Sequence, residues 1–263
     1  MLLFSHVSAG RYYCQKLLNT IASWQSAARF RFWNHEMDEN QWLNCDDPKQ
    51  MLELLIARDA SERKLRLFAI LCCRRVWDVR GDHKGFKHSI LQASEGAAEG
   101  TVGGPELAKT AGGIGALGAW SASARALDLL RATAHQSSSE AARNASECAT
   151  NYFALTAMES VGEEATGRRA FSIARRLEQT IQAAHIREIF GNPYRPVAAE
   201  RAWLMPEVVA LACDAYGQAG KLYLLAEVLE RAGCKDAEIL SHRRQIGPHV
   251  RGCWVMDLML GKS

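Results

Sequence analysis

Apolar residues recur every three or four positions along most of this chain, and this spacing constrains the fold more than any other feature. Leu65, Phe68 and Cys72, for example, share one face of a helix. The pair Asp47 and Pro48 is typical of a helix start, with an N-cap residue followed by proline at the first helical position. No segment alternates apolar and polar residues as a half-buried strand does. The sequence therefore predicts an all-α protein, an irregular multi-helix bundle with no significant sheet.

The longest predicted helix runs from 163 to 190. Gly191 ends it, because glycine readily takes the left-handed conformation found after many helices. Ile173, Leu177 and Ile181 recur at helical spacing within it, so we expect these side chains to face the core. Further helices are expected at about 61–79, 120–134, 140–159, 207–216, 221–232, 236–243 and 250–260.

The first 36 residues differ from the rest. They are rich in aromatic and basic residues, lack a clear apolar period, and contain no acidic residue before Glu36. Two interpretations are open: an organellar transit peptide, or sequence upstream of a true start at Met37. We therefore expect residues 1–36 to be a poorly ordered leader or a mis-assigned start. Residues 37–263 are expected to form a single helical domain.

Within that domain, glycine is frequent between residues 81 and 118. Each glycine weakens a helix by about 1 kcal/mol relative to alanine. We expect this Gly/Ala-rich stretch to be mobile, and its helical content is open.

Composition limits the compartment and the partners. The chain has 8 cysteines, and most of them lie in predicted helices with no secretory signal before them. This pattern indicates reduced thiols and a cytoplasmic protein. No apolar run is long enough to span a membrane. The net charge of +3 comes mainly from the first 36 residues, and basic and acidic residues balance from Met37 onward. We therefore expect neither a membrane nor a nucleic-acid partner.

The densest set of metal-binding side chains lies near the C-terminus. Cys234, His242, His249 and Cys253 supply two thiols and two imidazoles, a set that satisfies tetrahedral zinc. Their spacing matches no standard zinc motif, so packed thiols and surface histidines are the alternative. A thiol enzyme is a further alternative, with His249, Cys253 and Asp257 on one face of a final helix as base, nucleophile and orienting acid.

Arg195 lies between Pro193 and Pro196, in a segment that proline stiffens. Its guanidinium is a candidate contact for an anion, either carboxylate or phosphate. The alternative is that it bonds to the C-terminus of a helix inside the domain.

Several short segments are similar to those of a known group of proteins. They include Cys45-Asp46-Asp47-Pro48, Phe190-Gly191-Asn192-Pro193-Tyr194-Arg195-Pro196 and Gly247-Pro248-His249-Val250-Arg251-Gly252-Cys253-Trp254. Together they resemble a family of helical proteins of no established activity, abundant in planctomycete bacteria. The resemblance implies a bacterial source and a start near Met37. It implies no catalytic residues.

Two hypotheses for function follow. The first is a non-catalytic protein-interaction or scaffold module with a protein partner and no cofactor, because no catalytic constellation stands out. The second is a zinc-dependent or thiol enzyme that uses the C-terminal Cys/His cluster. The metal content of the purified protein distinguishes them.

Overall fold

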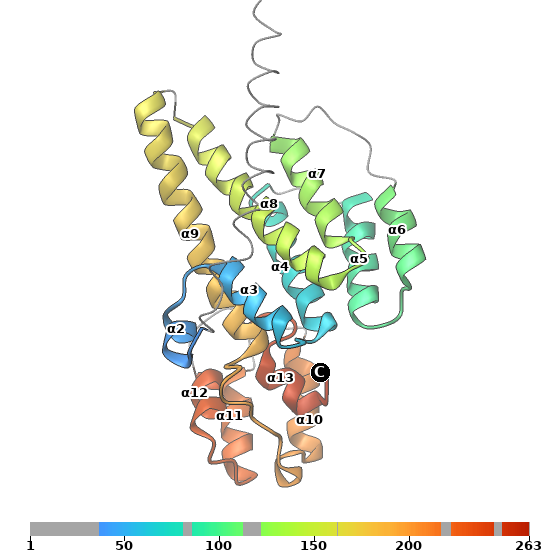
Figure 1. Cartoon of the computed structure of the whole chain (residues 1–263). Helices are drawn as coiled ribbons and strands as arrows, with labels where there is room; N and C mark the ends of the chain where they lie inside the picture. Colours follow the sequence, from blue (N-terminus) through green and yellow to red (C-terminus); the bar gives the residue numbers. More distant parts are fainter. Residues whose placement is uncertain are drawn as a thin grey trace, which may run out of the picture. The chain divides into compact units, whose positions relative to one another are not determined.

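The structure is a computed structural model, and it describes residues 37–80, 86–112, 122–161, 163–216, 222–244 and 249–262. Over these residues every regular element is a helix, so the predicted all-α class is confirmed (Figure 1). The helices are α2 (Glu39–Asn44), α3 (Pro48–Ala57), α4 (Glu62–Arg80), α5 (Phe86–Ala98), α6 (Gly104–Gly112), α7 (Ala122–Thr133), α8 (Ser138–Glu159), α9 (Glu164–Phe190), the 3-10 turn η1 (Arg201–Trp203), α10 (Pro206–Tyr216), α11 (Leu222–Arg231), α12 (Ala237–Arg244) and α13 (Trp254–Leu260). Glu39–Ser263 forms one compact unit. The expectation for residues 1–36 falls outside the described residues.

Local hydrogen bonds explain where several helices begin. Asp47 caps α3: its carboxylate accepts a hydrogen bond from the Lys49 main-chain N–H at 2.9 Å and from the Gln50 side chain at 2.9 Å. Ser137 caps α8 in the same way, accepting from the Glu140 N–H at 3.3 Å. These caps satisfy main-chain donors that have no partner inside the helix.

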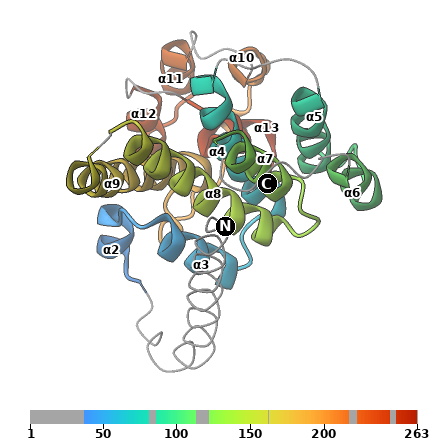
Figure 2. The same ribbon diagram turned by 90° about the horizontal axis from the view of Figure 1, so that it is seen from above.

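Helix α4 lies at the centre of the bundle. It packs against α5, α7, α8 and α9, and the view from above places it between α9 on one side and α5 and α6 on the other (Figure 2). Leu65, Phe68, Cys72 and Val76 are buried, as the periodicity predicts, and the opposite flank adds Ile70. Val79, the last residue of the predicted stripe, is 70% exposed, so its expected place in the core is wrong. A helix with apolar residues on nearly every side belongs inside a bundle.

Helices α10, α11, α12 and α13 form a smaller group around their own apolar cluster. That cluster contains Val208, Leu225, Leu229, Ile239 and Val255. Helix α13 also contacts the C-terminal part of α9, and Figure 1 shows the group gathered at that end of α9. This contact brings residues of α12 and α13 beside the last turn of α9.

The buried face of α9 differs from the prediction. Ile173 and Leu177 are each 60% exposed, so their expected place in the core is wrong. The buried face instead carries Glu178 and Gln182, whose polar atoms have partners. Arg75 donates to Glu178 at 2.9 Å, and Gln182 bonds to side chains of α8. Hydrogen bonds and an ion pair thus offset the cost of burying these polar groups.

Helices α5 and α6 occupy most of the glycine-rich stretch. Ile90 on α5 and Leu107 on α6 are fully buried. Gly96 allows a close approach, because a Cβ there would lie 2.5 Å from Cγ2 of Val102. Residues 81–85 and 113–121 lie outside the described residues, and the mobility of the stretch stays a prediction. Among the described helices, none has the length and apolar character needed to cross a bilayer.

Candidate metal centre

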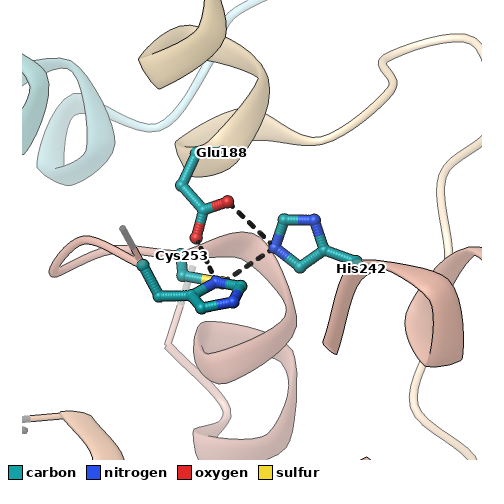
Figure 3. A group of neighbouring side chains, drawn as sticks. Glu188, His242 and Cys253 are labelled. Atoms are coloured by element: carbon teal, nitrogen blue, oxygen red, sulfur yellow. Dashed lines mark hydrogen bonds and ion pairs between the residues drawn. The ribbon is translucent and has the colours of Figure 1, made fainter. Parts of the chain in front are cut away.

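Four potential metal ligands from three parts of the chain meet beside the end of α9. Glu188 lies in the last turn of α9, His242 lies on α12, and His249 and Cys253 lie in the segment that leads into α13. Each offers one ligand atom, and these atoms all lie within 4.8 Å of one another. Figure 3 shows the side chains of Glu188, His242 and Cys253 pointing toward one another.

Gly191 sets the position of Glu188 relative to α13. It ends α9 with a φ of 69°. A Cβ at this position would lie 3.1 Å from Cγ of Trp254, the first residue of α13. Glycine therefore satisfies both the positive φ and the close contact with the indole ring. The last turn of α9 and the start of α13 are held together at this point.

Gly252 positions Cys253 by a similar close approach. It has a φ of 87°, and a Cβ there would lie 2.8 Å from Cδ1 of Leu67 on α4. The turn before α13 is thus pressed against the central helix. As a result, Cys253 is completely buried. Its main-chain carbonyl accepts the hydrogen bond from the Asp257 N–H at 2.9 Å that begins α13.

The Glu188 carboxylate bridges the two imidazoles. Its Oε2 lies 3.1 Å from Nε2 of His242, and its Oε1 lies 2.9 Å from Nδ1 of His249. The Sγ atom of Cys253 lies 3.3 Å from the same Nε2 of His242. The two imidazole rings meet edge to face, with centroids 5.3 Å apart. The donor atoms therefore converge on one small volume.

The electrostatics of the site favour an ionised Glu188. Burial alone would raise the pKa of this carboxyl group. Hydrogen bonds with His242 and His249, together with the electrostatic interaction with His242, outweigh burial and lower the pKa to about 2. At neutral pH the site therefore contains a carboxylate, and carboxylate oxygen is a zinc ligand.

The spacing of the donor atoms suits a tetrahedral ion. With metal–ligand bonds of about 2.0–2.3 Å, neighbouring ligand atoms around tetrahedral zinc lie about 3.3–3.8 Å apart. The distances from Nε2 of His242 to Oε2 of Glu188 and to Sγ of Cys253, 3.1 and 3.3 Å, are close to these edges, and the four ligand atoms all lie within 4.8 Å of one another. Thiolate and imidazole favour zinc and related transition metals, whereas magnesium and calcium prefer oxygen ligands throughout.

The same geometry does not form the predicted thiol triad. Helix α13 begins only at Trp254, so His249 does not share a helical face with Cys253 and Asp257. Asp257 instead accepts hydrogen bonds from Arg63 and Tyr216. A triad also requires the base to use its two nitrogens on different partners. His242, the other histidine of the group, cannot replace His249 as base in this way, because Cys253 and Glu188 both face its Nε2. The arrangement is that of converging ligands.

The structure brings together three of the four predicted ligands. His242, His249 and Cys253 meet, whereas Cys234 is not part of the group and is buried in the apolar cluster of α10–α13. Burial raises the pKa of the Cys234 thiol, which favours its protonated form. The fourth position belongs to Glu188, which the sequence did not single out. Its one local signal is its place in the last turn of α9, just before Gly191.

Arg195 pairs with carboxylates of the domain itself. It lies 2.5 Å from Glu39 and 3.5 Å from Glu238. The alternative role considered for it, bonding to the end of a helix, belongs to Arg187, which donates to the main-chain carbonyls of Trp42 and Cys45 at the end of α2. An external anion at Arg195 stays a prediction.

Comparisons with known protein families, with curated proteins and with solved structures find no match. The resemblance to a planctomycete family therefore stays a prediction. The function of the site rests on its geometry.

Proposed function

We propose that this helical domain binds one zinc ion through Glu188, His242, His249 and Cys253, and that the ion has a structural role in a non-catalytic scaffold. The observation that supports the proposal is the convergence of four ligand atoms from three separate segments within 4.8 Å. Four protein ligands fill the tetrahedral shell of zinc, which is typical of structural sites, whereas catalytic sites keep one position for water.

Zinc binding would also leave its ligand set without excess charge. A thiolate at Cys253 and the carboxylate of Glu188 together carry two negative charges, which a divalent cation neutralises. Cys253 is fully buried, and the side chains of Glu188 and His242 are only 14% and 13% exposed. Burying two anions side by side is costly unless a cation compensates them. The bound ion links α9 to α12 and to the start of α13.

Metal analysis of matched cysteine variants tests the proposal. Cys234 and Cys253 are both buried in the same apolar cluster, but only Cys253 belongs to the ligand group. We expect the wild type and Cys234→Ser to purify with one zinc per chain, and Cys253→Ser and Glu188→Gln to bind it much more weakly. A wild-type protein without zinc, which also fails to take it up on refolding, contradicts the proposal. So does equal zinc binding by all four proteins.

A protein-interaction role has an observation of its own. Ile173 and Leu177 are one turn apart on α9, and both are largely exposed. Exposed apolar neighbours on a helix favour a partner with an apolar surface. Light scattering over a range of concentrations tests one such partner, a second copy of the chain. Association that weakens in Leu177→Lys supports this role, and a monomer at all concentrations excludes self-association.

A further inference from the structure

A cavity of about 440 Å³ lies against one side of the candidate zinc site. Of the four proposed ligands, Glu188 and His242 form part of its wall. The remaining wall includes Leu43, Ala184, Arg187 and Trp254. A volume of this size is within the range of small-molecule sites, which runs from about 300 to 1,000 Å³. The cavity therefore gives a small molecule a route to one face of the ion.

A basic side chain in the wall of this cavity can attract an anion. Zinc with the Cys253 thiolate and the Glu188 carboxylate is neutral overall. Arg187 adds a positive charge to the wall, and its hydrogen-bond acceptors are the main-chain carbonyls of Trp42 and Cys45. Glu238 also lines the cavity, and it shares Arg195, at 3.5 Å, with Glu39. Arg187 therefore provides the wall with a guanidinium that can attract a carboxylate toward the ion.

The protein ligands differ in how readily such an anion can displace them from the zinc ion. Cys253 is completely buried, and its thiolate is the softest donor of the set. Glu188 borders the cavity and binds through a carboxylate oxygen, which an incoming carboxylate can replace with no change of donor type. The indole of Trp254 and the side chain of Leu43, which is 51% exposed, offer apolar surface for the rest of the molecule.

We infer that the zinc ion binds a small carboxylate ligand from this cavity, with Glu188 as the protein ligand that gives up its position. The inference rests on the proposed zinc site and adds a binding activity to its structural role. Ligand exchange forms one metal–oxygen bond and breaks another, so it requires no redox partner. The scaffold thus binds a small carboxylate at the junction of α9, α12 and α13.

Cobalt substitution tests the inference, because the visible spectrum of Co(II) responds to a change of ligand. The full chain is loaded with Co(II) and titrated with sodium acetate, with sodium chloride at equal ionic strength as the control. We expect acetate to shift the cobalt bands in a saturable manner and chloride to leave them unchanged. Cobalt bands that do not shift with acetate overturn the inference. An equal shift with chloride shows that the site does not select carboxylates.

Two tryptophan variants on α12 test whether the ligand enters through the cavity. Ser241 lines the cavity and Ala237 does not, although both are exposed positions of the same helix. We expect Ser241→Trp to bind cobalt but to lose the acetate response, and Ala237→Trp to keep both. An acetate response in both variants overturns entry through this cavity. A wild-type protein that binds no cobalt contradicts the zinc site itself, which separates the two failures.

Discussion

Two buried polar clusters lie one turn apart at the start of α13, and they differ in what completes them. One is the candidate zinc site, which includes Cys253. The other surrounds Asp257, one turn further along, where Arg63 donates to Asp257 at 2.8 Å and to Glu99 at 3.1 Å. Tyr216 donates to the other oxygen of Asp257 at 3.0 Å. The Asp257 cluster contains its own cation, whereas the site around Cys253 gathers acidic groups and imidazoles without a lysine or arginine among its four members.

The comparison shows how a fold stabilises buried charge in two ways. Asp257 is only 1% exposed, and a guanidinium from α4 neutralises it. Burial lowers the pKa of Arg63, but its hydrogen bonds with Asp257 and Glu99 raise it above its usual value, so it stays charged. The proposed zinc site would take its cation from solution instead. We therefore expect the Asp257 cluster to be independent of metal and the site around Cys253 to depend on it.

The largest effect is expected from Arg63→Met. This change leaves the buried Asp257 carboxylate without its cation, and removing one partner of a buried pair costs about 3–5 kcal/mol. Urea denaturation of the zinc-loaded protein measures the loss. The double variant Arg63→Met/Asp257→Leu should recover much of the stability, because it removes both charges. A loss below about 1 kcal/mol for the single variant would show that Arg63 does not balance Asp257.

Removing the metal should have the next largest effect. If zinc is present at about 100 to 1,000 times its dissociation constant, binding stabilises the native state by about 2.7–4.1 kcal/mol. A chelator should lower the free energy of unfolding of the wild type by this amount. In Glu188→Gln the loss should be much smaller, since less metal is bound. If the chelator does not change the free energy of unfolding of the wild type, the site around Cys253 is as independent of metal as the Asp257 cluster.

The pH dependence should separate the clusters. Burial, with the charge of Asp257, raises the pKa of Tyr216 to about 12. The ordinary value is about 10, so the unfolded chain releases this proton first and stability falls as the pH rises from about 10 to 12. The contribution is on the order of 2 kcal/mol, and Tyr216→Phe should flatten that part of the curve. Acid should instead release the proposed zinc ion from the other cluster, since zinc ligands must be deprotonated.

The smallest effect is expected outside both clusters, at Leu177→Lys. The side chain is 60% exposed, so a charge there should change the free energy of unfolding by less than about 0.5 kcal/mol. Ile186→Ala on the same helix is the matched comparison, because Ile186 is fully buried and its loss should cost about 2–5 kcal/mol. Similar losses of unfolding free energy in both variants would show that Leu177 is buried, as the sequence predicted.

Much of the fold could be predicted from the sequence because it depends on local patterns. The cap at Asp47, the apolar face of α4 and the end of α9 at Gly191 all follow from residues close to one another in the chain. The buried face of α9 could not be predicted. Glu178 and Gln182 are buried because α4 and α8 supply their polar partners, and apolar periodicity carries no information on such pairs.

The candidate site was predictable in part for the same reason. His242, His249 and Cys253 are close in sequence and could be recognised as a group. Cys234 fits the same pattern, but its place in the apolar cluster follows from the packing of α11 and α12. Glu188 comes from a distant helix, and only the contact between α9 and α13 brings it to the site.

X-ray absorption at the zinc edge tests the central claim most directly, because it reports the number and type of ligand atoms around the ion. The account predicts one sulfur at about 2.3 Å and three nitrogen or oxygen atoms at about 2.0–2.2 Å. Cys253→Ser should remove the sulfur, and Cys234→Ser should leave the spectrum unchanged. Two sulfur ligands, or a spectrum without sulfur, would contradict the site of Glu188, His242, His249 and Cys253.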